Sequence, residues 1–180
     1  MRGLTLWPEW AFAVAVLGKD HENRPKPAYR YGLRVGDRFA IHAGAYLGGR
    51  KGAPATWEAL QAVFHMAGRA GVGRRTSLTA PPYPSLGVAD RADWAKFHVL
   101  SGRHYPAQKV VAVATLLGCQ YNEADASGWR VPGQYGFHLH VQVLPSMVSC
   151  SVQEYPGNRQ GLWSLPGPVA AAVRGQLAAS

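Results

Sequence analysis

Residues 4–24 read LTLWPEWAFAVAVLGKDHENR, an apolar stretch that leads directly into a group of charges. The pattern predicts a short strand over 4–6, followed by a helix that begins at Pro8 and ends before Gly18. Proline suits the first turn of a helix, where its missing N–H needs no partner, and glycine tolerates the left-handed backbone that ends helices. The helix is apolar on almost every side, so we expect it to be buried. It would hold three charged side chains at the edge of a cleft: Lys19, Glu22 and Arg24.

The composition limits the class of protein. The chain has 180 residues, 47% of them hydrophobic, which is enough for the core of one domain. No apolar run approaches the length of a membrane span, so we expect no membrane partner. No secretory leader is visible, and we expect a cytoplasmic protein. Cys119 and Cys150 are too few for a disulfide framework or a zinc site, and we expect both to be reduced.

The charge favours a polyanionic partner. Nineteen Lys and Arg against ten Asp and Glu give a formal charge of +9. Residues 1–75 carry +7 of it and residues 76–180 carry +2. Arginine outnumbers lysine, as suits forked contacts to phosphate. Charge alone leaves an ordinary soluble basic protein as an equal alternative.

Strand patterns occur towards both ends of the chain, and the middle is irregular. Glycine and proline interrupt residues 45–106, which we interpret as a partly helical insertion with a helix over 57–68. We expect a C-terminal helical tail over 167–180. The prediction for residues 1–180 is a single α+β domain, a small β-barrel with flanking helices. The predicted strands after the first helix include 38–44, 109–117, 137–144 and 160–166.

Four blocks of sequence occur in the order found in a known family. They are residues 4–11 running into Lys19-x-x-Glu22-x-Arg24, then 36–44, 109–119 and 143–166. With these blocks the chain resembles the ASCH (activating signal cointegrator-1 homology) domains of the PUA-like superfamily of small β-barrels. The resemblance implies a cleft beside the Lys-x-x-Glu-x-Arg strand that binds RNA or other nucleic acid. It does not cover 45–106, and Leu17 stands where the family usually has glycine.

Some ASCH relatives are enzymes, so the resemblance also implies an enzymatic function as an alternative to nucleic-acid binding. One group resembles amidohydrolases that act on acetylated cytidine through a lysine, a threonine nucleophile and a glutamate, and ribonuclease activity occurs in others. Here Glu22 occupies the position of the threonine, three residues after Lys19. We therefore expect binding rather than catalysis. A nucleoside amidohydrolase or ribonuclease, with Lys19 and Glu22 as its acid–base pair, remains the alternative.

The neighbourhood of the charged strand supplies further candidates for nucleic-acid contact. Glu22 can orient both cations, and Arg24 can then form a fork with a phosphate or a base edge. The competing interpretation is an ion-pair network that only holds the corner between helix and strand. Aromatic rings can stack on bases, although we expect Trp7 to lie in the core. The residues that we expect to complete the binding surface are Trp10, Tyr31, His42, Arg74 and Arg75.

Metal and cofactor motifs are missing from the sequence. His138 and His140 share a strand face at a spacing that can chelate a metal, but no third ligand follows at a suitable spacing. We interpret them as a solvated strand face and expect neither metal nor cofactor. No phosphate-binding loop or nucleophile elbow is present. A third hypothesis is an adaptor that binds a protein through the 45–106 insertion.

Overall fold

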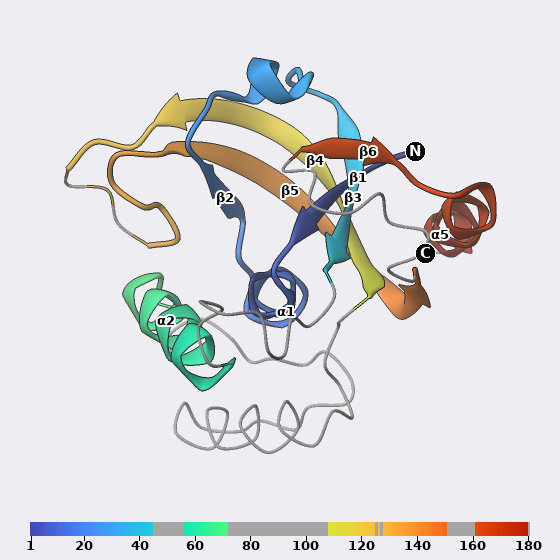
Figure 1. Ribbon diagram of the computed structural model, residues 1–180, viewed down its shortest axis with the longest axis horizontal. Coiled ribbons are helices and arrows are strands. Elements are labelled where there is room, and N and C mark those ends of the chain that lie inside the picture. Colours follow the sequence, from blue (N-terminus) through green and yellow to red (C-terminus); the bar gives the residue numbers. More distant parts are fainter. Residues whose placement is uncertain (45–55, 72–107, 125, 127, 151–160, 180) are drawn as a thin grey trace, which may run out of the picture.

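The computed structural model describes residues 1–44, 56–71, 108–124, 126, 128–150 and 161–179. In these residues six strands form one mixed sheet, and helices pack against it (Figure 1). In chain order the elements are β1 (Arg2–Leu6), α1 (Pro8–Val16), β2 (His21–Arg24), the 3-10 helix η1 (Ala28–Tyr31), β3 (Arg38–Ala43), α2 (Thr56–Arg69), β4 (Lys109–Tyr121), β5 (Tyr135–Ser149), β6 (Leu162–Ser164) and α5 (Gly167–Ala179).

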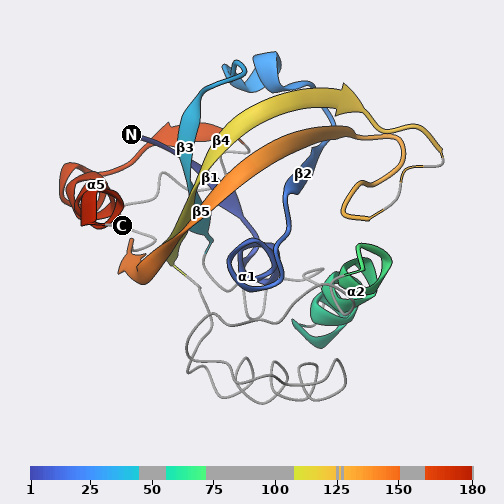
Figure 2. The ribbon, with the colours of Figure 1, turned by 180° about the vertical axis from the view of Figure 1, so that it is seen from behind.

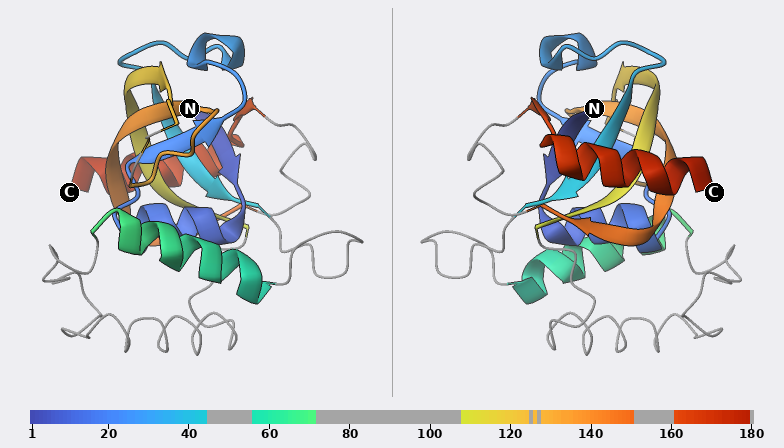
Figure 3. Two further views of the ribbon diagram at one scale, coloured as in Figure 1. Left: turned by 90° about the vertical axis from the view of Figure 1, so that its left-hand side faces the viewer. Right: turned by 90° about the vertical axis from the view of Figure 1, so that its right-hand side faces the viewer.

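The sheet has the strand order β2-β5-β4-β3-β1-β6. β1 and β3 are parallel, and the other neighbouring strands are antiparallel. The register of β4 shifts once against β3 and twice against β5. Such irregularities bend a strand and increase its twist, so the long strands β4 and β5 curve and the sheet curls into a half-barrel (Figure 3). The predicted α+β class with a barrel-like sheet is confirmed.

Successive side chains along the strands point to opposite faces of the sheet, and both faces are packed. Phe39 and Ile41 of β3 pack in one core cluster with Ala11 of α1, inside the curl of the sheet. Ala40, between them, belongs to a second cluster that contains Val173 of α5. α1 therefore lies under the inner face and α5 covers part of the outer face (Figures 1 and 2).

α1 is packed on more than one side, as its uniformly apolar sequence predicts. One side belongs to the core cluster inside the sheet, through Ala11 and Val14. Another side, through Phe12, packs against Val63 and Ala67 of α2. Burial on several sides holds both ends of α1 in place, including the end from which the charged strand departs.

The remaining structural expectations have mixed outcomes. Helix α2 and the strands β3 and β6 occur where the sequence predicts them, and β4 and β5 extend beyond the predicted 109–117 and 137–144. The rest of the 45–106 insertion lies outside the described residues. The expected C-terminal tail is a helix packed on the sheet, with Val169 and Val173 buried. Trp7 is 57% exposed, so its prediction as a core residue is wrong. It precedes Pro8 at the N-terminal cap of α1, where the side chain lies outside the core. Across the described residues, no helix combines the length and apolar character needed to cross a membrane.

Candidate functional site

The end of α1 places Lys19 in a tight turn ahead of β2. Gly18 adopts a left-handed backbone with φ of 69°, and the amide of Lys19 donates to the carbonyl of Ala13 at 3.1 Å. This bond closes the C-terminal turn of the helix. In a continuous strand Lys19 would face away from Glu22, but the turn brings its side chain round to the same side. The turn therefore allows the three charged side chains to meet.

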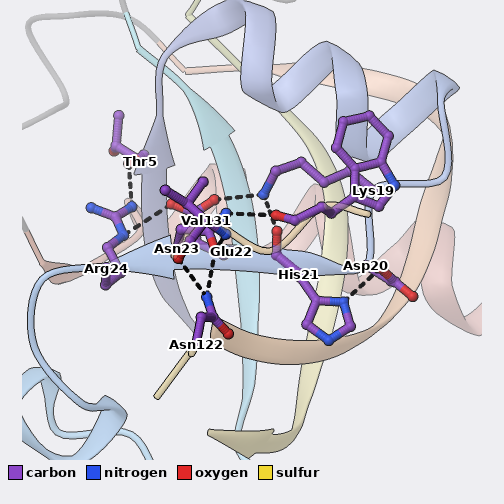
Figure 4. Close-up of polar contacts among 10 residues, drawn as sticks. Thr5, Lys19, Asp20, His21, Glu22, Asn23, Arg24, Asn122 and Val131 are labelled. Carbon is purple, nitrogen blue, oxygen red and sulfur yellow. Dashed lines mark hydrogen bonds and ion pairs between the residues drawn. The ribbon is translucent and has the colours of Figure 1, made fainter. Parts of the chain in front are cut away.

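Lys19, Glu22 and Arg24 converge on the inner side of β2 (Figure 4). The ammonium of Lys19 donates to Glu22 Oε2 at 2.9 Å and also to the carbonyl of His21. Arg24 Nε lies 3.0 Å from Glu22 Oε1, as an ion pair without the alignment of a hydrogen bond. We call these three residues the triad. Two cations share one carboxylate, so the triad carries a net positive charge.

The triad is largely removed from water. The side chains of Lys19, Glu22 and Arg24 are 1%, 10% and 14% exposed. The ring of Trp10 lies 5.7 Å from the Lys19 ammonium and adds a cation–π contact. Buried charges persist only when they are paired, which makes Glu22 the centre of the arrangement. Arg24 is the more accessible cation, and Lys19 has no exposed path to a large ligand in this conformation.

Arg24 also joins two strands that are not neighbours in the sheet. Its terminal Nη2 donates to the carbonyl of Thr5 in β1 at 3.3 Å. β2 is an edge strand that pairs with β5 alone, and β1 lies near the opposite edge of the sheet. The curl of the sheet therefore brings β2 and β1 together across its opening. We call this place, with Thr5 on one side and residues 22–24 on the other, the seam.

A polar network on the other side of β2 holds the strand to the β4–β5 connection. Asn23 donates to the carbonyl of Trp129 at 2.8 Å and accepts from the amide of Val131 at 2.9 Å. Asn122, which is buried, donates to Asn23 Oδ1 at 3.1 Å. A Cβ on Gly136 would lie 2.7 Å from Asn122 Oδ1, so this packing requires glycine. The sequence did not predict this network, although Asn23 lies between Glu22 and Arg24 in the motif.

Two histidines stack on the outer side of the same strand. His21 and His138 are direct partners in the β2–β5 ladder, with ring centroids 4.8 Å apart. Asp20 lies 2.7 Å from His21 Nδ1, and this hydrogen bond lowers the pKa of the Asp20 carboxyl. His138 is exposed as predicted but is stacked as well as solvated. Nowhere in the described ranges do three or more His, Cys, Asp or Glu side chains gather in a group that could hold a metal ion.

The other predicted site residues lie in different places. Trp10 is beside the triad, as described above. Tyr31 packs edge-on against Phe137, the ladder partner of Glu22, so it lies inside the curl of the sheet. Arg74 and Arg75 lie outside the described residues.

His42 does not reach the triad. His42 is buried, with its Nδ1 atom 3.1 Å from Thr5 Oγ1 and its Nε2 atom 3.3 Å from the carbonyl oxygen of Cys150. Its ring also packs edge-on against the ring of Trp163. Trp163 and Cys150 belong to the second core cluster, the one that contains Val173 of α5. His42 therefore lies on the outer face of the sheet, opposite to the face that carries the triad. Burial lowers the pKa of His42 and favours the neutral ring. Its prediction as a residue of the cleft is wrong.

No family model matches the chain, and a search of curated proteins returned no match either. The resemblance to ASCH domains therefore depends on the four sequence blocks.

Proposed function

We propose that the protein is a nucleic-acid-binding module of the ASCH type, a PUA-like barrel that binds RNA or single-stranded or modified DNA at the seam. The observation that carries this proposal is the convergence of two cations on one carboxylate at the opening of a curled sheet. The net charge of +9 adds long-range attraction to phosphate, which supplies much of the affinity of nucleic-acid binders.

Within this proposal the three residues have different roles. Arg24 contacts the ligand, because its side chain is the most exposed of the three. Glu22 and Lys19 are positioning residues. The carboxylate fixes the guanidinium, and the ammonium fixes the carboxylate. A guanidinium held in this way loses little side-chain entropy on meeting a phosphate or a base edge.

The hydrolase alternative has less support from the same geometry. A general base must reach the proton that it removes. The Lys19 ammonium is enclosed by Glu22, the His21 carbonyl and the ring of Trp10. Binding is therefore the function that the arrangement supports better.

The test is a titration of labelled oligouridylate and oligothymidylate with the wild-type protein and Arg24→Gln, followed by fluorescence anisotropy at several salt concentrations. Arg174→Gln is the matched control, because Arg174 is exposed on α5, away from the seam (Figure 1). We expect Arg24→Gln to weaken binding about tenfold or more and to lower the salt slope by about 0.7, the value for one single-strand phosphate contact. Equal affinities of the two variants would overturn the proposal.

A further inference from the structure

A second basic surface lies on the connection between β2 and β3. Residues 26–38 contain η1 and carry a single carboxylate, that of Asp37. We call this segment the basic platform. None of its cations takes part in the triad. Its basic residues, all of them exposed, are Lys26, Arg30, Arg34 and Arg38.

The backbone of the basic platform is fixed to the sheet. The amide of Ala28 donates to Cys119 Sγ at 3.4 Å, and Leu33 is buried in the inner core. At the other end the amide of Gly36 donates to the carbonyl of Leu116 at 2.8 Å. The platform is thus anchored on β4 at two places. A fixed backbone limits the freedom of the segment before binding, which reduces the entropy lost when a ligand binds.

The carboxylate of the platform is already engaged. Arg2 of β1 donates to Asp37 Oδ2 at 2.9 Å and to the carbonyl of Gly32 at 2.7 Å. The amide of Arg34 donates to the same Asp37 oxygen at 2.9 Å. Because Asp37 is satisfied by Arg2 and by backbone, the platform keeps an excess of positive charge.

An exposed aromatic ring lies beside one of these cations. Tyr29 is 67% exposed, and the guanidinium of Arg30 lies 5.6 Å from its ring centroid. Neighbouring Tyr31 faces inward and packs on Phe137, so the two tyrosines of η1 point to different environments. Proteins that bind single strands use exposed aromatic rings to stack on the bases, while neighbouring cations contact the phosphates. The pair of Tyr29 and Arg30 has this combination.

We propose that the basic platform binds the backbone of a single-stranded nucleic acid and that Tyr29 stacks on one of its bases. This inference rests on the proposed function, since the ligand is of the same class, and it adds a second contact surface. Tyr29 follows Arg24 by five positions in the chain, so their Cα atoms are at most about 18 Å apart. One oligonucleotide can therefore contact the seam and the platform together.

The test uses the same labelled oligouridylate and oligothymidylate with platform variants of the full chain. We expect Tyr29→Ala to weaken binding about fivefold to 150-fold, which corresponds to one stacked base, and Tyr29→Phe to bind like the wild type. We expect the double variant Arg30→Ala/Arg34→Ala to lower the salt slope by about 1.4, the value for two single-strand phosphate contacts. The control variants are Tyr121→Ala, an exposed ring on β4, and Arg174→Ala.

The possible outcomes separate this inference from the proposed function. If Arg24→Gln loses affinity while the platform variants bind like their controls, the platform inference is overturned and the seam stands. If the platform variants lose affinity while Arg24→Gln does not, the seam assignment is overturned and the platform stands. If the double variant loses affinity but Tyr29→Ala does not, the stacking role is overturned. A wild-type protein that binds neither oligonucleotide overturns both proposals.

Discussion

Replacing Glu22 by glutamine keeps the size of the side chain and removes the negative charge from between Lys19 and Arg24. The variant leaves two cations together, one of which has a side chain that is only 1% exposed. Breaking a buried ion pair by neutralising one partner typically costs about 3–5 kcal/mol of stability. We therefore expect Glu22→Gln to lower the free energy of unfolding by about that amount near neutral pH.

Urea unfolding followed by tryptophan fluorescence measures this loss of stability. Glu123→Gln is the matched control, because Glu123 is exposed and its loss should change stability by no more than about 0.5 kcal/mol. Lys19→Met/Glu22→Gln removes one buried cation together with the carboxylate, so we expect it to be more stable than Glu22→Gln alone. If Glu22→Gln unfolds like Glu123→Gln, the triad does not carry the buried charge that we describe.

Two further predictions concern the packing around the seam and the outer face of the sheet. Gly136→Ala should cost about 1–3 kcal/mol in chemical unfolding, because its Cβ would meet the fixed amide of Asn122, whereas Gly118→Ala has open space and should cost less. Equal costs would contradict the described packing. Burial lowers the pKa of His42, so the stability from its neutral ring is present above about pH 6.5 and is lost as the pH falls below it. His42→Asn should flatten the acid limb of the stability curve relative to the wild type, and the exposed His140→Asn should not; the reverse result would refute this role.

The sequence predicts more of the local geometry of the triad than of the structure around it. Gly18 predicts the end of α1, and alternation predicts that Glu22 and Arg24 share a face of β2. The sequence could not decide whether the turn would bring Lys19 to the same face, because that depends on the exact backbone after Gly18. Nor could it show that Thr5 lies across the seam, since the pairing of distant strands is set by the curl of the whole sheet.

The sequence itself contains a signal against the wrong prediction for His42. Phe39 and Ile41 mark the inner face of β3, so the next residue in the strand faces outward. The family motif places His42 beside the cleft, whereas the alternation along β3 places it on the outer face. The exposure of Tyr29 had no comparable signal. Tyr29 and Tyr31 are alike in sequence, and only the fold of η1 separates the one in water from the one in the core.

The most direct test of the central claim is a titration of the protein with oligouridylate while the Nε–H resonance of Arg24 is followed by NMR. The account predicts that this resonance shifts and saturates with the ligand, while that of Arg174 on α5 stays in place. An Arg24 resonance that does not move when the protein is saturated with oligonucleotide would contradict nucleic-acid binding at the seam.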